Sequence, residues 1–331
     1  MDISVSLAVV LLLVLAAEFV NGWTDAPNAI ATVVSTRVLS PTQAVIMAAV
    51  LNIVGALVTG TAVATTIGTG IVKPEAIDLH TVASAMVAIV IWSTLAWRWG
   101  LPTSETHALV AGLAGAGIAA AGPSVLLWVG WKKVLIGLVL ATVIGFSFGF
   151  ILMVIIYRSF SRASHTSIKA IFGRLQILSS AFMAFSHGSN DGQKFMGAFA
   201  LALFLGGILP QFQVPIWVIL LCGAVMGLGT AFGGWRIIRT MGFRLTKLEP
   251  VNGFAAETSA GLAITLASFL GIPLSTTQTI NTAIMGVGAT RRFSAVRWGV
   301  TREIVLAWLL TFPACGILGF LFAFLLKPIF Q

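Results

Sequence analysis

Charged residues are scarce in this chain. Asp, Glu, Lys and Arg together make up 9% of the 331 residues, whereas soluble domains contain about 25%. Hydrophobic residues make up 58% of the sequence, and its mean hydropathy is +1.02. This composition excludes a soluble globular protein and predicts a polytopic membrane protein, with room for about ten spans of roughly 20 residues each.

Polar stretches and cysteines are also sparse. No segment is polar enough to form a separate soluble domain. Cys222 and Cys315 lie alone in apolar stretches, without the spacing of a metal site or a disulfide framework. The N-terminus has no basic region and no small-residue cleavage site after Val20, so we expect the first span to remain in the mature protein.

Positive charge is present but concentrated. The net charge is +9, and twelve of the nineteen Lys and Arg residues fall in three loops, at 158–174, 235–247 and 291–302. Short basic loops between apolar stretches follow the positive-inside rule, so this charge indicates topology rather than a nucleic-acid surface. We expect a multi-pass protein of the plasma (inner) membrane with these loops in the cytoplasm and both termini outside.

The apolar segments form two sets of five, at 1–157 and 175–331, joined by the basic linker at 158–174. NGWTD at 21–25 matches HGSND at 187–191, and GLPTSETH at 100–107 matches GIPLSTTQ at 271–278. An odd number of segments in each repeat reverses the orientation of the second repeat. The sequence therefore predicts an all-α fold of two inverted-topology repeats, an arrangement typical of secondary transporters.

The first motif of each repeat is expected to interrupt a helix at membrane depth. Asp25 lies within an apolar segment, where a carboxylate facing lipid costs at least about 2.5–3.5 kcal/mol. Pro27 removes a backbone donor and Gly22 relaxes the local dihedral angles, so we expect a break over 21–28 and a matching break over 187–194. Broken helices or re-entrant hairpins at this depth require a polar central site. The simpler interpretation is a proline kink beside a packed polar residue.

The second motif of each repeat is a proline followed by hydroxyl side chains. A proline that opens a helix leaves free N–H groups, and a helix N-terminus with Ser and Thr binds anions. Two such ends facing each other would hold a tetrahedral oxyanion, whereas a pair of ordinary N-caps is the alternative. The hydroxyl residues are Ser104, Thr106, Ser275, Thr276 and Thr277.

Acidic residues near these motifs indicate a coupling cation. An anion does not bind beside Asp25 and Asp191 unless protons or metal ions lie between them. Their oxygen-rich surroundings suit Na⁺, and protonated carboxyl groups are the alternative. The expected cation-coupling residues are Asn21, Asp25, Glu105, Asn190, Asp191 and Glu257, with Na⁺ held at Asp25 and Asp191.

Four further side chains are candidates for a proton or polar relay: His107, His187, Lys194 and Gln278. A lone histidine inside the membrane is about as often a packed, hydrogen-bonded residue as a proton carrier. Lys194 has the charge to contact an anion, but pairing with Asp191 is the favoured interpretation.

Four segments of the chain carry a family resemblance: NGWTDAPNAIATVVSTR, GLPTSETHALVAGL, FSHGSNDGQK and IPLSTTQTINTAIMGVGATRRFSAVRWGV. They resemble the signature segments of the PiT family of inorganic phosphate transporters. The resemblance spans essentially the whole chain and implies phosphate symport with Na⁺ or H⁺, and a homodimer. It also implies that phosphate is bound by Asp25, Asn28, Ser104, Thr106, Asn190, Asp191, Ser275, Thr276 and Thr277.

Four positions depart from the family pattern: Thr24, Glu105, Lys194 and Gln278. They leave the cation and its stoichiometry open. The sequence thus predicts a secondary active transporter, not an enzyme, that imports phosphate with Na⁺ or H⁺ by alternating access, without a cofactor. The alternatives are transport of sulfate or arsenate, transport of a cation bound by the intramembrane acids, a passive channel, and an intramembrane hydrolase.

Overall fold

The computed structural model describes residues 4–330, which form an all-helical fold without strands. The longer helices are α1 (Val5–Ser35), α2 (Pro41–Val58), α4 (Leu79–Trp99), α5 (Glu105–Ala121), α6 (Trp128–Ser159), α7 (His165–Leu205), α8 (Ile216–Phe232), α10 (Pro250–Phe269), α11 (Thr276–Ala289) and α12 (Trp298–Phe330). The shorter ones are α3 (Ala62–Gly70), α9 (Trp235–Arg239) and a π-helical turn (Thr240–Arg244), with 3₁₀ turns at Pro74–Ala76, Pro123–Val125 and Phe293–Ala295.

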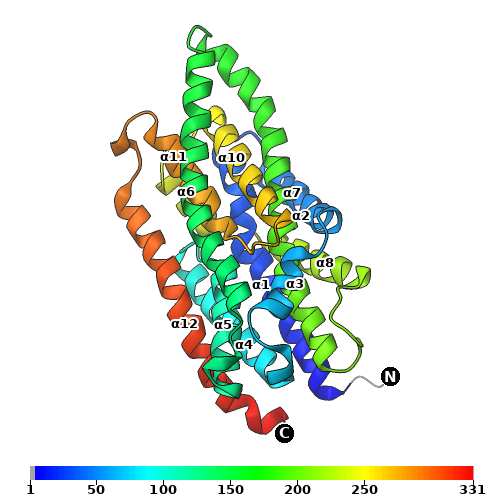
Figure 1. Ribbon diagram of the computed structural model, residues 1–331. Helices are drawn as coiled ribbons and strands as arrows, with labels where there is room; N and C mark the ends of the chain where they lie inside the picture. Colours follow the sequence, from blue (N-terminus) through cyan, green and yellow to red (C-terminus); the bar gives the residue numbers. More distant parts are fainter. Residues whose placement is uncertain (1–3, 331) are drawn as a thin grey trace.

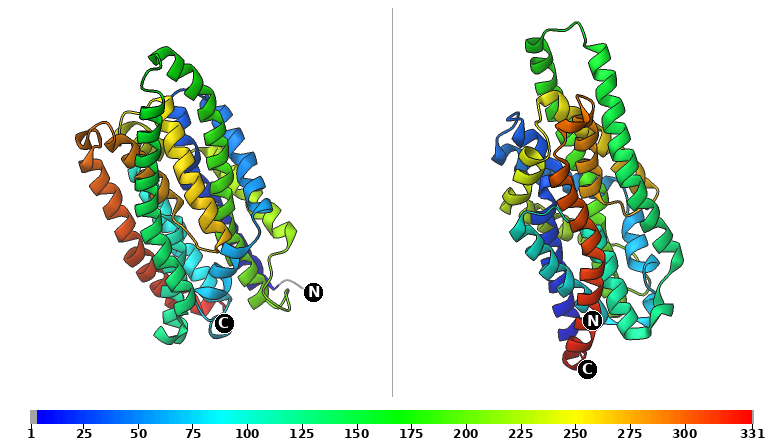
Figure 2. Two further views of the ribbon diagram at one scale, coloured as in Figure 1. Left: turned by 45° about the horizontal axis from the view of Figure 1, so that its top comes forward. Right: turned by 90° about the vertical axis from the view of Figure 1, so that its left-hand side faces the viewer.

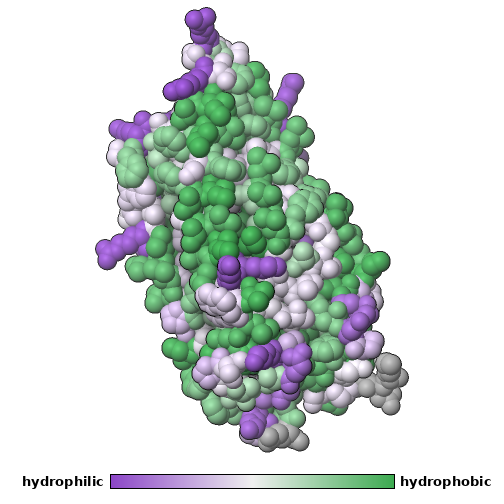
Figure 3. Space-filling view, viewed as in Figure 1, coloured by the Kyte–Doolittle hydropathy of each residue, from purple (hydrophilic) through white to green (hydrophobic). Residues whose placement is uncertain are grey.

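Among residues 4–330, six helices are long and apolar enough to cross a membrane: α1, α2, α4, α6, α7 and α12. A seventh span is formed if α8 and the segment Trp235–Arg244, bent by 61°, count as one. The surface seen in Figure 3 is largely hydrophobic, with most hydrophilic side chains toward its two ends. The multi-pass, all-α prediction is confirmed. The ten predicted segments, however, are not ten separate crossings.

Four of these segments form two helical hairpins. The outer ends of α4 and α5 are joined by hydrogen bonds from the Lys73 N–H to the Val125 carbonyl and from the Leu127 N–H to the Ile71 carbonyl. The outer ends of α10 and α11 are joined likewise, from the Arg297 N–H to the Leu245 carbonyl. Each hairpin therefore begins and ends at one end of the molecule. Its tip, at 102–104 or 271–275, is buried inside the protein.

The breaks predicted at 21–28 and 187–194 are wrong, because α1 and α7 continue through both segments. Pro27 is accommodated in α1 because Gly234 approaches it closely: a Cβ on Gly234 would lie 2.7 Å from the Trp23 carbonyl oxygen and 2.9 Å from Pro27 Cγ. Packed neighbours make a proline tolerable in a membrane helix. The irregular backbone lies instead at the hairpin tips.

The glycines of these motifs serve close packing rather than flexibility. A Cβ on Gly22 would lie 2.2 Å from the Met226 carbonyl oxygen, and a Cβ on Gly188 would lie 2.0 Å from the Asn52 carbonyl oxygen. Small residues let membrane helices approach this closely. As a result, α1 packs against α8 and α7 packs against α2, so each long helix contacts the other half of the chain.

The order of elements in the first half recurs in the second. A long helix, a span, a short helix, a hairpin and a final long helix occur in Val5–Ser159 and again in His165–Phe330. Both termini lie at one end of the molecule, and the turn between α6 and α7 lies at the other (Figures 1 and 2). That turn comprises only residues 160–164, because the rest of the predicted 158–174 linker belongs to the ends of α6 and α7.

Candidate functional site

The two predicted acidic residues are brought together where α1, α7 and the start of α11 meet. Thr277 Oγ1 donates to Asp25 Oδ1 at 3.2 Å, and Thr276 Oγ1 donates to Asp191 Oδ2 at 2.9 Å. Asn28 Nδ2 donates to Thr277 Oγ1 at 2.9 Å and to Thr276 Oγ1 at 3.3 Å. Five side chains from three elements thus form one connected and fully buried polar network.

The first turn of α11 supplies the hydroxyls of this network. Ser275 is the N-cap, and its Oγ accepts a hydrogen bond from the Gln278 N–H at 3.3 Å. The cap leaves Thr276 and Thr277 in the first turn, where N–H groups have no intrahelical partner. The positive end of the α11 dipole is therefore directed at the two carboxylates.

Asp191 has two further partners on its own helix. Lys194 forms an ion pair with Asp191, as predicted, and the His187 Nε2 lies 3.5 Å from Asp191 Oδ2. The other ring nitrogen of His187 lies 3.2 Å from Asn52 Oδ1 on α2. Asp191 is thus in contact with a fixed positive charge, whereas the Oδ2 of Asp25 is buried without a hydrogen-bond partner among residues 4–330.

The ligand atoms of Asp25, His187 and Asp191 lie within 4.8 Å of one another. A metal ion could bridge them, since carboxylate oxygens and an imidazole nitrogen are common metal ligands. The threonine hydroxyls and the Asn28 amide add oxygen atoms, which a hard cation such as Na⁺ prefers. The chemistry of these donors therefore fits a cation next to Asp25.

Glu105 lies one contact away from the acidic pair. Its Oε1 accepts a hydrogen bond from Thr24 at 2.9 Å, and its Oε2 accepts one from Ser93 at 2.9 Å. Thr24 neighbours Asp25 on α1, so Glu105 connects the α4–α5 hairpin to the helix that carries the site.

Asn190 and Thr106 form hydrogen bonds with the α10–α11 tip and not with the acidic pair. Asn190 donates to the Ile272 carbonyl at 3.1 Å and accepts from the Leu274 N–H at 3.1 Å. Thr106 donates to the Leu274 carbonyl at 3.0 Å and so joins one hairpin to the other. These contacts use side-chain groups that the sequence had assigned to phosphate.

Ser104 caps α5 just as Ser275 caps α11, and its Oγ accepts from the His107 N–H at 3.3 Å. Each hydroxyl thus has the N-cap role weighed as the alternative to anion binding. A serine oxygen that accepts a cap bond still has a proton to donate. The caps therefore leave both hydroxyls able to contact an anion.

Several predicted residues lie apart from the central network. Glu257 accepts hydrogen bonds from Thr32, Ser179 and Gln176 and joins α10 to α1 and α7. Thr32 is seven residues beyond Asp25 on α1, which corresponds to about 10 Å along the helix. The Asn21 amide donates to Glu18 at 3.0 Å.

His107 and Gln278, the matched residues of the two hairpins, both line a cavity of about 180 Å³ between α6 and α12. The His107 ring stacks on Phe312 with 4.4 Å between the centroids. The two side chains therefore lie with each other and not with the acidic pair.

The sequence interpretation missed several residues that support the site: Thr32, Asn52, Ser93, Gln176, Ser179 and Gln193. Each is a buried polar residue that contacts a predicted site residue or anchors its helix. The available signal was their position within apolar segments, because polar groups at membrane depth need a partner.

Two carboxylates, a buried lysine and two helix N-terminal regions inside a multi-pass helical membrane protein define the class of an ion or solute transporter. The comparisons with known proteins agree. The model of the phosphate transporter family matches residues 21–319. The chain belongs to the phosphate transporter family.

Individual relatives extend this similarity over nearly the whole chain. A probable low-affinity inorganic phosphate transporter of Rhizobium meliloti is 45% identical over 303 residues, 91% of each chain. One of the same name from Bacillus subtilis is 40% identical over the full length of both chains. A solved structure described as the sodium-dependent phosphate transporter matches with a TM-score of 0.91 and 26% identity, covering 98% of this chain and 100% of that one. The relatives are named as transporters, and the family resemblance is confirmed.

Proposed function

We propose that this protein imports inorganic phosphate across the inner membrane in symport with a cation, by alternating access between two inverted repeats. The observation that carries the proposal is the single buried network that joins Asp25 to Asp191 through Thr276, Thr277 and Asn28. Hydroxyl donors for an oxyanion and carboxylates for a cation are adjacent in this network, so each ligand stabilises the other.

Phosphate is held in this proposal at the N-terminus of α11, opposite that of α5. Both ends carry hydroxyl side chains and free N–H groups, which suit a tetrahedral anion. Phosphate is favoured over sulfate because a protonated anion can donate to carboxylate acceptors. The names of the relatives point the same way.

The coupling cation is Na⁺ in this proposal, bound next to Asp25. The Oδ2 of Asp25 is buried without a partner among residues 4–330, and the name of the solved relative specifies sodium dependence. Proton coupling is the alternative, because a protonated Asp25 would also remove the negative charge that repels the anion.

Lys194 supplies the positive charge at the other carboxylate. In the repeat alignment Lys194 occupies the position of Asn28, and Asp191 that of Asp25. At Asp191 the positive charge comes from the ammonium group of Lys194, which is part of the chain. At Asp25 a mobile cation supplies the positive charge. The site thus needs fewer dissolved cations than two symmetric Asp–Asn halves would need.

The two repeats, 1–157 and 175–331, act as the moving parts. The hairpins start from opposite ends of the molecule and meet at their tips, which puts the network between the repeats. The three basic loops face the cytoplasm in this proposal, since basic loops are retained on that side. Both termini then face outside.

Uptake of radiolabelled phosphate into proteoliposomes tests the proposal, with a Na⁺ gradient and a pH gradient imposed separately. Accumulation under the Na⁺ gradient alone supports it, and accumulation under the pH gradient alone identifies H⁺ as the coupling ion. Sulfate and a metal cation are assayed in parallel, because uptake of either without phosphate accumulation would assign a different substrate.

A further inference from the structure

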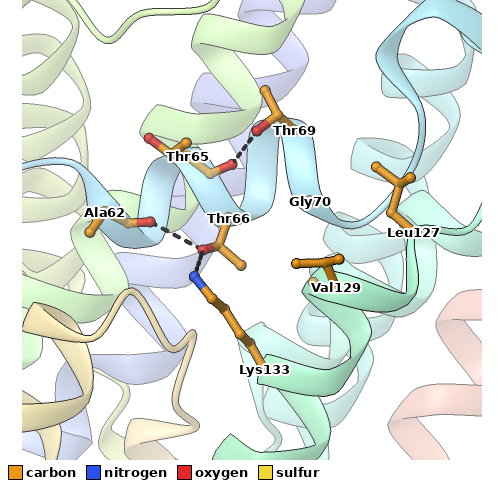
Figure 4. A pocket seen from close by; sticks show the side chains of 9 residues that line it. Ala62, Thr65, Thr66, Thr69, Gly70, Leu127, Val129 and Lys133 are labelled. Atoms are coloured by element: carbon orange, nitrogen blue, oxygen red, sulfur yellow. Dashed lines mark hydrogen bonds between the residues drawn. The ribbon is translucent and has the colours of Figure 1, made fainter.

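A cavity of about 580 Å³, separate from the one lined by His107 and Gln278, lies between α3 and the start of α6. Figure 4 shows its polar side chains, which are Thr65, Thr66 and Thr69 on α3 and Lys133 on α6. None of these residues belongs to the acidic network. The three hydroxyl groups donate to the main-chain carbonyls of Thr61, Gly271 and Thr65. The cavity therefore offers one ammonium group as its donor to an anion, at a place separate from the acidic network.

Lys133 is the charged group of this cavity. Its Nζ donates a hydrogen bond to Thr66 Oγ1 at 3.2 Å, and its side chain is half-buried (Figure 4). Among residues 4–330, no carboxylate lies within 4.0 Å of this ammonium group, in contrast to Lys194. A lysine has three donors, so the charge and the remaining donors are available to an anion.

One lining residue of the cavity contacts the hairpin tip that lies next to the central site. Thr66 Oγ1 donates to the Gly271 carbonyl at 2.8 Å, and Gly271 is the first residue of the buried α10–α11 tip. The next residues of that tip, Ile272 and Leu274, bond Asn190, which neighbours Asp191. One hairpin tip thus separates Lys133 from the acidic network.

The matching position in the other half carries the opposite charge. Lys133 is the sixth residue of α6, and Glu303 is the sixth residue of α12. Glu303 is exposed and lies 3.6 Å from Arg244. The positive charge of Lys133 therefore has no counterpart at the matching position of α12, where Glu303 is paired with Arg244.

We propose that this cavity is an entry site that binds phosphate through Lys133 before the anion passes the α10–α11 tip. The inference rests on the proposed phosphate transport. Free phosphate and a phospholipid head group share the same oxyanion chemistry. The bond from Thr66 to the tip favours free phosphate, because this tip separates the cavity from the acidic network.

The first test compares initial uptake rates over a range of phosphate concentrations for the unmodified protein, Lys133→Gln, Lys133→Arg and Lys132→Gln. Lys132 is exposed and precedes Lys133 in the same helix, so it is the matched control. We expect Lys133→Gln to raise KM about tenfold, as the loss of one charge-assisted contact would, with Vmax little changed. Lys133→Arg and Lys132→Gln should retain the original KM, and an unchanged KM in Lys133→Gln would overturn the proposal.

The second test measures binding without transport. Cys222 and Cys315 are buried, so a Thr65→Cys variant presents an exposed thiol to a membrane-impermeant reagent at the cavity. We expect phosphate to slow its labelling several-fold. Protection should persist with Asp191→Asn and with Lys132→Gln but disappear with Lys133→Gln.

Labelling that phosphate does not slow, or protection that is lost with Asp191→Asn, would overturn the entry site. Absence of phosphate uptake by the unmodified protein would instead overturn the proposed function, and the two failures are distinct. Both tests are repeated in vesicles of phosphatidylcholine alone and with phosphatidylglycerol added. Equal effects of Lys133→Gln in both support free phosphate, and an effect confined to phosphatidylglycerol vesicles would assign the cavity to a lipid head group.

Discussion

Thr240 donates a hydrogen bond to the carbonyl oxygen of Gly100 at 2.8 Å and thereby holds the tip of the α4–α5 hairpin. Thr66 and Gly271 make the matching bond, also at 2.8 Å, at the tip of the α10–α11 hairpin. In each case the threonine comes from a short helical segment of the opposite half of the chain. The two tips are thus held reciprocally.

Removing either threonine hydroxyl should release one tip. Thr66→Val and Thr240→Val keep the side-chain volume but lose the donor. We expect the labelling of Thr65→Cys to become faster with Thr66→Val, because release of the α10–α11 tip favours opening on the side of the cavity. Labelling should become slower with Thr240→Val, because release of the α4–α5 tip favours opening on the opposite side. Thr142→Val, an exposed threonine that bonds only within α6, is the control. Shifts in the same direction for both variants would contradict reciprocal gating.

Neutralising either central carboxylate should abolish phosphate accumulation. Asp25→Asn and Asp191→Asn retain a hydrogen-bond acceptor for Thr277 or Thr276 but remove the charge that binds the cation. Uptake into proteoliposomes under a Na⁺ gradient should fall to the level of empty vesicles, while Glu75→Gln, an exposed acid, should transport normally. Full accumulation by both asparagine variants would exclude the acidic pair from coupling.

Lys194→Asn should make the protein more dependent on Na⁺. The change leaves Asp191 buried without its attached cation, and breaking such a pair costs about 3–5 kcal/mol. Because added Na⁺ can take the place of the ammonium group, we expect Na⁺ to raise the melting temperature more than in the unmodified protein. The Na⁺ dependence of uptake should also become steeper.

Lys169→Gln, an exposed change on the same helix, is the control for that experiment. A response to Na⁺ equal to that of the unmodified protein would show that Lys194 does not replace a cation.

Two glycines of α7 should respond oppositely to alanine. A Cβ at Gly188 would meet backbone atoms of Asn52 at 2.0–2.5 Å, whereas a Cβ at Gly173 has no atom within 4 Å. Gly188→Ala should lower stability by about 1–3 kcal/mol through overpacking. Gly173→Ala should raise it by up to ~1 kcal/mol through helix propensity. Thermal unfolding in detergent measures both, and equal melting temperatures would disprove the close approach of α2 and α7.

Much of the fold was predictable from local patterns. The apolar segments gave the helices, and the spacing of the Pro102 and Pro273 motifs placed the starts of α5 and α11. The sequence also indicated the pairing of Lys194 with Asp191, since side chains three positions apart on a helix lie on the same face. The predicted breaks failed because the effect of Pro27 and Gly22 depends on which neighbouring helix packs against them.

The sequence by itself determined that this chain spans a membrane, that two motifs each occur once in both halves, and that acidic residues lie at membrane depth. These properties follow from composition and spacing. Only the tertiary structure decided which polar groups meet. Thr277 bonds Asp25 across 252 residues of sequence, and Thr66 reaches Gly271 across 205. Such partners depend on how closely whole helices pack, and local periodicity carries no information about that distance.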